Sequence, residues 1–173
     1  MFTRSVLFSG LALLVTSAAA HAQTATSAVS VEVAPVLAIS TSGAFAFPTA
    51  DDSHYSTGYV ESTSGPTLEH RGNVPYKITL AAQSGSALAF SPASGRSDPD
   101  PNKPIGDLTI QSTISGTGVD VAVGAAGSAN DFYTRAARGG NLSSTLAARM
   151  ALDYDNDPPG TYSTTVVFTM IAQ

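Results

Sequence analysis

The stretch Gly160-Thr-Tyr-Ser-Thr-Thr-Val-Val-Phe-Thr-Met-Ile-Ala-Gln173 decides the fold class of this chain, because apolar and polar residues alternate along it. Val166, Phe168 and Met170 fall on one face, and mostly polar residues fall on the other. A period of two is typical of a half-buried β-strand, whose successive side chains point to opposite faces. We therefore predict one long strand over residues 160–173 that finishes inside its own sheet.

Similar alternation recurs throughout the sequence and predicts seven to nine strands. Clusters of Gly, Pro, Ser and Asp separate the alternating segments, as in a two-sheet sandwich. Leu142–Tyr154 also has apolar residues at helical spacing, but alternation accounts for more of them, so we predict a strand there. The other predicted strands cover residues 29–39, 43–47, 74–80, 87–90, 108–112 and 119–123.

The segments between these strands are predicted to be turns and loops, with one short helix. Gly65–Gly72 and Ser91–Gly106 are the predicted long loops, and only Asp131–Arg138 is a candidate helix. Asp155–Gly160 is rich in turn residues and would lead into the last strand as a hairpin. Because no linker divides the chain, we predict a single immunoglobulin-like antiparallel β-sandwich over residues 23–173.

The N-terminal residues predict export. Residues 1–22 contain Arg4, an apolar core from Val6 to Val15, and small residues ending in Ala20-His21-Ala22, which together are typical of a cleaved signal peptide. The apolar core is shorter than the roughly 20 residues that a membrane helix needs. We expect a periplasmic, cell-surface or extracellular protein without membrane insertion. An outer-membrane barrel would also alternate, but the chain has no tryptophan for an aromatic girdle.

The charge and the cysteine content restrict the class of partner and the source of stability. The formal net charge is −5, so we expect no nucleic acid partner, since nucleic acids bind basic patches. No cysteine is present, so stability has to come from core packing without disulfides. A single domain of this length can bury a sufficient core.

No catalytic motif is recognisable in the sequence. It contains no Gly-x-Ser-x-Gly elbow, no His-Glu-x-x-His helix and no glycine-rich phosphate loop. His54 and His70 have polar neighbours, so we expect both in exposed turns. We predict that the protein is not an enzyme and uses no cofactor.

Three aspartates have part of the spacing of a calcium-binding loop. Asp153, Asp155 and Asp157 have the first spacings of an EF-hand and are the candidate metal ligands. Pro158 stands where such a loop needs glycine, and Thr164 stands where it needs a bidentate glutamate. A solvated turn is the simpler interpretation.

Tyrosines in predicted loops suggest an alternative function. Tyr55, Tyr59 and Tyr133 could stack on sugar rings, whereas Tyr76 is expected in the core. The alternative to a structural role is therefore a secreted or periplasmic module that binds carbohydrate or another ligand.

Three stretches carry a family resemblance: Val29–Ile39 followed by Phe45-Ala-Phe47, the strand Val74–Leu80, and the closing Pro159–Thr169. In these the chain resembles small exported β-sandwich proteins of bacteria, the spore-coat-U-like and pilin-like domains and, more distantly, the WxL surface domains. The resemblance implies a structural subunit of the cell surface or of an appendage. It also implies assembly by strand addition, in which one chain adds a strand to an open sheet edge of the next.

The segment Gln23–Val33 suits such strand addition. Val29, Val31 and Val33 alternate with polar residues and would be the strand-exchange anchors. The partner would be another copy of the chain or another surface protein. An ordinary first strand within the chain's own sheet explains the same alternation and is the simpler interpretation.

Overall fold

The computed structural model describes residues 26–112 and 119–173. The predicted signal peptide, residues 1–22, lies outside the described residues. The chain divides into an N-terminal unit that ends at Val33 and a body from Ala34 to Gln173. In the described part of the chain, no helix is long and apolar enough to cross a membrane.

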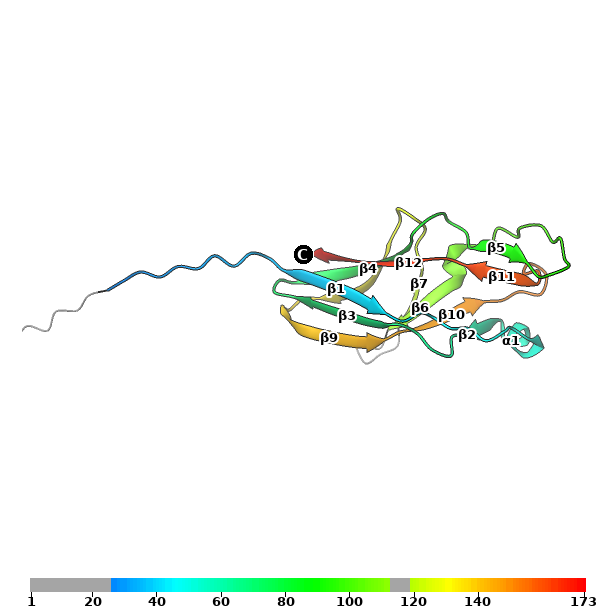
Figure 1. Ribbon diagram of the computed structural model, residues 1–173, viewed down its shortest axis with the longest axis horizontal. Coiled ribbons are helices and arrows are strands. Elements are labelled where there is room, and N and C mark those ends of the chain that lie inside the picture. The colour runs from blue at the N-terminus through cyan, green and yellow to red at the C-terminus, as the bar shows by residue number, and fades with distance from the viewer. Residues whose placement is uncertain (1–25, 113–118) are drawn as a thin grey trace, which may run out of the picture. The chain divides into compact units, whose positions relative to one another are not determined.

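The regular elements in the described part of the body are β-strands, apart from two short helices (Figure 1). Its elements in chain order are β1 (Leu37–Ser42), α1 (Asp52–Thr57), β2 (Tyr59–Glu61), β3 (Thr67–Gly72), β4 (Tyr76–Ala82), β5 (Ala89–Pro92), η1 (Ile105–Asp107), β6 (Leu108–Ser112), β7 (Val119–Ala122), β8 (Asn130–Arg135), β9 (Gly139–Thr145), β10 (Ala147–Ala151), β11 (Gly160–Ser163) and β12 (Val166–Ala172).

The strands form four sheets with antiparallel pairing, in the orders β1-β3-β9, β2-β10-β6-β7, β11-β5 and β12-β4-β8. β9 and β10 follow each other with only Leu146 between them, so the first two sheets continue one another. β11 and β12 connect the other two sheets in the same way. The prediction of an all-β fold with antiparallel sheets is confirmed.

A single hydrophobic core joins the sheets. Tyr76, Ile78 and Leu80 of β4, the central strand of its sheet, are fully buried, as their alternation predicted. Leu68 of β3 and Ile110 of β6 reach the same core from the other sheets. Full burial of one such aliphatic side chain contributes about 1.5–3 kcal/mol. The core therefore accounts for stability in a chain without disulfides.

The prediction of one continuous final strand is wrong. Residues 160–173 form two strands, β11 paired with β5 and β12 paired with β4, with a break at Thr164 and Thr165. The alternation itself is confirmed in β12, because Val166, Phe168 and Met170 pack against the core. The break lets one run of sequence serve two sheets.

Two further assignments are corrected by strand pairing. The predicted loop Gly65–Gly72 contains β3, which is the central strand between β1 and β9. The predicted helix Asp131–Arg138 is largely β8, which pairs with β4 and buries Phe132. In both places a neighbouring strand offers a hydrogen-bonded ladder and a core-facing position, and these outweigh local preference. The α1 helix was not predicted.

Candidate functional site

β1 and β12 are edge strands that lie beside each other (Figure 1). Leu37 pairs with Gly72 and Ala172 pairs with Tyr76, so β1 begins at the end of the body where β12 finishes. The two strands therefore run in opposite directions. Among the described residues, no strand pairs with the outer side of either one.

The backbone groups on the free edge of β12 follow from its ladder. The N–H of Gln83 donates to the carbonyl of Thr165 over 2.8 Å. Hydrogen-bonded and non-bonded residues alternate in an antiparallel ladder. Val166, Phe168 and Met170 therefore direct their N–H and C=O groups away from β4, toward the free edge. The side chains of the same three residues face the core.

The edge of β1 is arranged in the same way. The N–H of Asn73 donates to the carbonyl of Val36 over 3.1 Å. By the same alternation, Leu37, Ile39 and Thr41 present their backbone groups to the free edge. Leu37 and Ile39 also pack against the core. A free edge of this kind is a template for a further strand.

A cleft of about 1000 Å³ opens where β1 ends, between the segment that follows β1 and the segment that comprises β11 and the start of β12. One wall consists of residues from 41 to 50, and the other consists of residues from 158 to 168. Buried core residues form part of its lining, among them Val60, Leu88 and Leu108, and Met150 packs against them. We call this cleft the groove. Its lining offers apolar contacts, and its walls offer unpaired backbone groups.

Prolines shape both walls of the groove. Ala46 makes an isolated bridge with Ser64: its N–H donates to the carbonyl of Ser64 over 3.0 Å, and its carbonyl accepts from the N–H of Thr63 over 2.7 Å. Pro48 follows soon after, and it has no N–H with which to continue a ladder. Pro158 and Pro159 act in the same way at the start of the opposite wall. The groove therefore remains open between two walls that cannot pair along their whole length.

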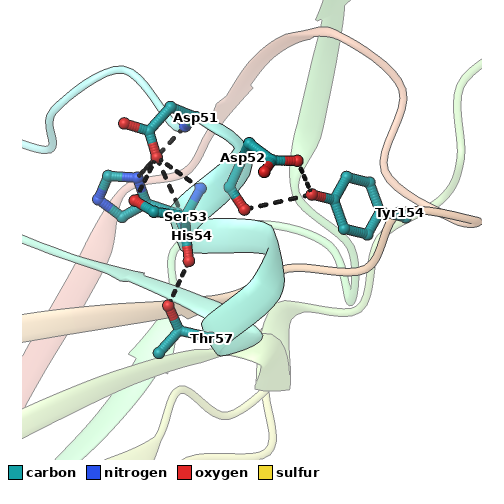
Figure 2. Close-up of polar contacts among 6 residues, drawn as sticks. All are labelled: Asp51, Asp52, Ser53, His54, Thr57 and Tyr154. Carbon is teal, nitrogen blue, oxygen red and sulfur yellow. Dashed lines mark hydrogen bonds and ion pairs between the residues drawn. The ribbon is translucent and has the colours of Figure 1, made fainter.

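The α1 helix contributes Tyr55 to the lining of the groove and is fixed by its N-cap (Figure 2). The carboxylate of Asp51 accepts hydrogen bonds from the N–H groups of Ser53, at 3.0 Å, and His54, at 3.2 Å. Hydrogen bonds from the side chains of Ser53 and His54 lower the pKa of Asp51 to about 2. At the other end of the helix, the Thr57 hydroxyl donates to the carbonyl of Ser53. The helix is thus held at both ends.

Two tyrosines connect α1 to the turn that follows β10. The hydroxyl of Tyr154 donates to the carboxylate of Asp52 (Figure 2), and its ring stacks on Tyr55 with centroids 4.7 Å apart. Tyr55 lines the groove and donates to the carbonyl of Asp157. This contact orders the groove end. Sequence reasoning missed it, because residues about 100 positions apart meet there.

The carbohydrate candidates are not brought together as one surface. Tyr55 lies in α1, Tyr59 lies in β2 with the guanidinium of Arg149 4.2 Å from its ring centroid, and Tyr133 lies in β8. Tyr133 packs edge-on against the ring of His70, at 5.3 Å. Tyr76 is in the core, as predicted.

The calcium candidates lie in one turn but serve different hydrogen bonds. Asp157 is buried, and its carboxylate accepts from the Lys103 ammonium at 2.7 and 2.9 Å. Asp153 accepts from the N–H of Asp155 and from the amide of Asn156. Within residues 26–112 and 119–173, no group of three or more acidic, histidine or cysteine side chains is placed to hold a metal ion.

The expectation of an exposed His70 is wrong. His70 lies in β3 and is only 2% exposed, with Nδ1 2.6 Å from the hydroxyl of Tyr76. Its Nε2 is buried without a hydrogen-bond partner among the described residues. Burial, and secondarily the charge of Arg135, lower the pKa of His70 below 6.5. His70 is therefore neutral in the folded protein at neutral pH.

We expect acid to destabilise the protein through His70. Because its folded-state pKa lies below the unfolded value of 6.5, the unfolded chain binds the proton more readily. The contribution of His70 to the free energy of unfolding is therefore complete above pH 6.5, and it is lost as the pH falls below that value. Urea titrations between about pH 7.5 and pH 5.5 measure this slope. The double variant His70→Leu/Tyr76→Phe removes both polar partners and should flatten it; an unchanged slope would contradict the assignment.

The strand-exchange candidates lie outside every strand. Val29, Val31 and Val33 are 86%, 80% and 74% exposed, and residues 26–36 have no helix or strand. The predicted strand over 29–39 therefore begins only at Leu37. Pro35 explains the boundary, since it fixes its own backbone and lacks an N–H.

The features that bear on function are two free strand edges, an apolar groove that adjoins them, and a segment of exposed alternating valines. No model of a known protein family matches this sequence, and no curated protein matches it significantly.

Proposed function

We propose that this chain is a non-catalytic structural subunit of the bacterial cell surface or of a surface appendage. In this proposal it is an immunoglobulin-like sandwich exported by means of residues 1–22, and its subunits assemble by β-strand addition. The groove, together with the free edges of β1 and β12 that continue from its walls, is the observation that carries the proposal. The occupant is the segment 26–33 of another copy.

The chemistry of the segment matches the groove. An added strand would hydrogen-bond to the free backbone groups of the edge and place alternate side chains in the groove. Val29, Val31 and Val33 repeat every two residues, about 6.6 Å apart along a strand, which is also the repeat of core-facing residues in β12. Each valine that moves from water into the groove contributes about 1.5 kcal/mol or more. Ser30 and Glu32 would face away from the groove.

The length of the segment also fits. Eight residues in extended conformation reach about 26 Å. The wall formed by β11 and the start of β12 runs from Gly160 to Phe168, which is about as many residues. Residues 26–33 can therefore follow most of this wall.

Replacing the three valines tests the proposal. In the exported chain, residues 23–173, the triple variant Val29→Ser/Val31→Ser/Val33→Ser should be monomeric, while the unaltered chain forms filaments or larger oligomers. The loss of three buried valines removes several kcal/mol of binding. Light scattering after gel filtration and negative-stain microscopy measure the outcome.

The matched control changes the opposite face of the same segment. Ser30→Ala/Glu32→Gln should assemble as the unaltered chain does, because these side chains would face away from the groove. Both variants should keep the thermal midpoint of the monomer. Assembly of the triple valine variant at the unaltered level would refute strand addition.

A further inference from the structure

The charges of the body are separated between its two ends. Lys77, Arg96, Lys103 and Arg149 each form an ion pair with a carboxylate. Arg71, Arg135 and Arg138 form no ion pair with any carboxylate of the described residues, and we call the end of the body that holds them the arginine end. It is the end where β1 begins and β12 finishes (Figure 1).

The three arginines gather around one small hollow. Arg71 and Arg138 line a cleft of about 370 Å³ together with Val36. The guanidinium of Arg135 lies over Gly139, another lining residue, so closely that a Cβ there would come within 2.1 Å of it. Positive charge is therefore concentrated at this end, in a chain whose net charge is negative.

The opposite end of the body is acidic, and we call it the acidic tip. It comprises α1, the loop after β5 and the turn after β10, which lie together at one end (Figure 1). Its two cations, Arg96 and Lys103, are already held by aspartates. The exposed carboxylates that remain there are Asp51, Asp52, Asp100, Asp153 and Asp155.

The groove lies next to the acidic tip, whereas residues 26–33 are joined to the body at the arginine end. Tyr55, Pro158 and Tyr162 line the groove next to the acidic tip. The chain that carries the valines leaves the body at the arginine end, where the N–H of Val36 donates to the side chain of Asn73 over 2.6 Å. A subunit that donates residues 26–33 therefore brings its arginine end toward the acceptor.

We infer that subunits join head to tail, with the arginine end of one copy on the acidic tip of the next. Residues 26–33 would then enter the acceptor's groove at the tip and run antiparallel to β12. This inference rests on the proposed function and adds the direction in which the donated segment lies in the acceptor's groove. Opposite charges at the junction favour this encounter and speed association.

Insertion in the opposite direction would bring the arginine ends of both copies together. Like charges across an interface disfavour that pairing. A head-to-tail contact uses two different surfaces. However many copies are added, the assembly therefore keeps one unoccupied arginine end and one unoccupied acidic tip. The assembly expected from it is an open filament, in contrast to a closed dimer.

Charge reversal at each end tests the direction. Arg71→Glu/Arg138→Glu makes the arginine end acidic, and Asp100→Lys/Asp155→Lys makes the tip basic; Asp51 and Asp52 are left in place because Asp51 caps α1 and Asp52 accepts from Tyr154. Each double variant alone should assemble at least about 10-fold more weakly than the unaltered chain, because like charges meet at every junction. An equimolar mixture of the two should assemble, because the two variants can alternate along the filament and unlike charges then meet at every junction.

The outcomes separate this inference from the proposed function. Recovery in the mixture, together with weaker assembly of the unaltered chain in about 300 mM salt than in about 20 mM, supports head-to-tail joining. Unaltered assembly of both double variants overturns the inference. The triple valine variant then decides separately whether subunits assemble by strand addition. A chain that remains monomeric even at low salt overturns both.

Discussion

Replacing Lys103 with methionine is expected to lower the free energy of unfolding by about 3–5 kcal/mol. Lys103 and Asp157 are both buried, and the ammonium lies 2.7 and 2.9 Å from the two carboxylate oxygens. Removal of the cation leaves Asp157 buried, and among the described residues only the N–H of Asp153, at 2.8 Å, then donates to its carboxylate. Urea denaturation of the variant near neutral pH measures the loss.

A surface ion pair provides the matched control. Lys77 donates to Asp131 over 2.9 Å, but both side chains are partly in water. Lys77→Met should therefore cost at most about 1 kcal/mol. The double variant Lys103→Met/Asp157→Leu should recover much of the loss, because an apolar pair of similar volume leaves no charge buried. Equal effects of Lys103→Met and Lys77→Met would contradict the interpretation.

The buried pair also bears on the groove. Lys103 belongs to the loop after β5, and Asp157 belongs to the turn before β11, so their contact joins two parts of the acidic tip. Burial, with Asp157 as a further cause, raises the pKa of Tyr162 to about 12. The Tyr162 phenol therefore stays protonated and donates to the carbonyl of Pro158 over 2.9 Å. These contacts fix the groove wall on which we expect an added strand to lie.

The strands that could be predicted are those with an unmixed apolar face. The predicted strand over 74–80 lies in β4 from Tyr76 onward, β4 continues to Ala82, and Leu108–Ser112 is β6 with the predicted boundaries. In both segments every core-facing position but the last of β6 is apolar, so burial and local pattern agree.

β3 could not be predicted because its inward positions are Leu68, His70 and Gly72. Only the first of these reads as apolar. His70 is tolerated in the core because Tyr76, from another strand, satisfies one of its nitrogens. Contacts between distant segments are invisible to local periodicity.

The groove could not be predicted from the sequence either, although the segment that we propose to occupy it could. The sequence indicated Val29, Val31 and Val33 as anchors for strand addition. It could not indicate an acceptor, because the two walls are about 110 residues apart in the chain and only the sheet order leaves their edges free. The separation of charge between the two ends of the body depends on topology in the same way.

Gly65→Ala is the second substitution with a large expected effect. A Cβ at Gly65 would come 1.9 Å from the carbonyl oxygen of Leu146 and 3.2 Å from the ring of Phe45. The first contact is with backbone, held by the 2.9 Å hydrogen bond from Leu146 to the carbonyl of Pro66, so no rotamer change can relieve it. We expect a loss of about 3 kcal/mol, at the upper end of the range for overpacking.

The same substitution should also disturb strand addition, because Phe45 and Pro66 both line the groove. Gly106→Ala is the control, since a Cβ at Gly106 would meet nothing within 4 Å. That variant should be as stable as the unaltered chain, or slightly more so, because alanine restricts the unfolded state. Urea denaturation and the assembly assay should then separate the two variants, with Gly65→Ala weakened in both. A Gly65→Ala variant of unaltered stability would contradict the close approach of Gly65, between β2 and β3, to the backbone of Leu146, between β9 and β10.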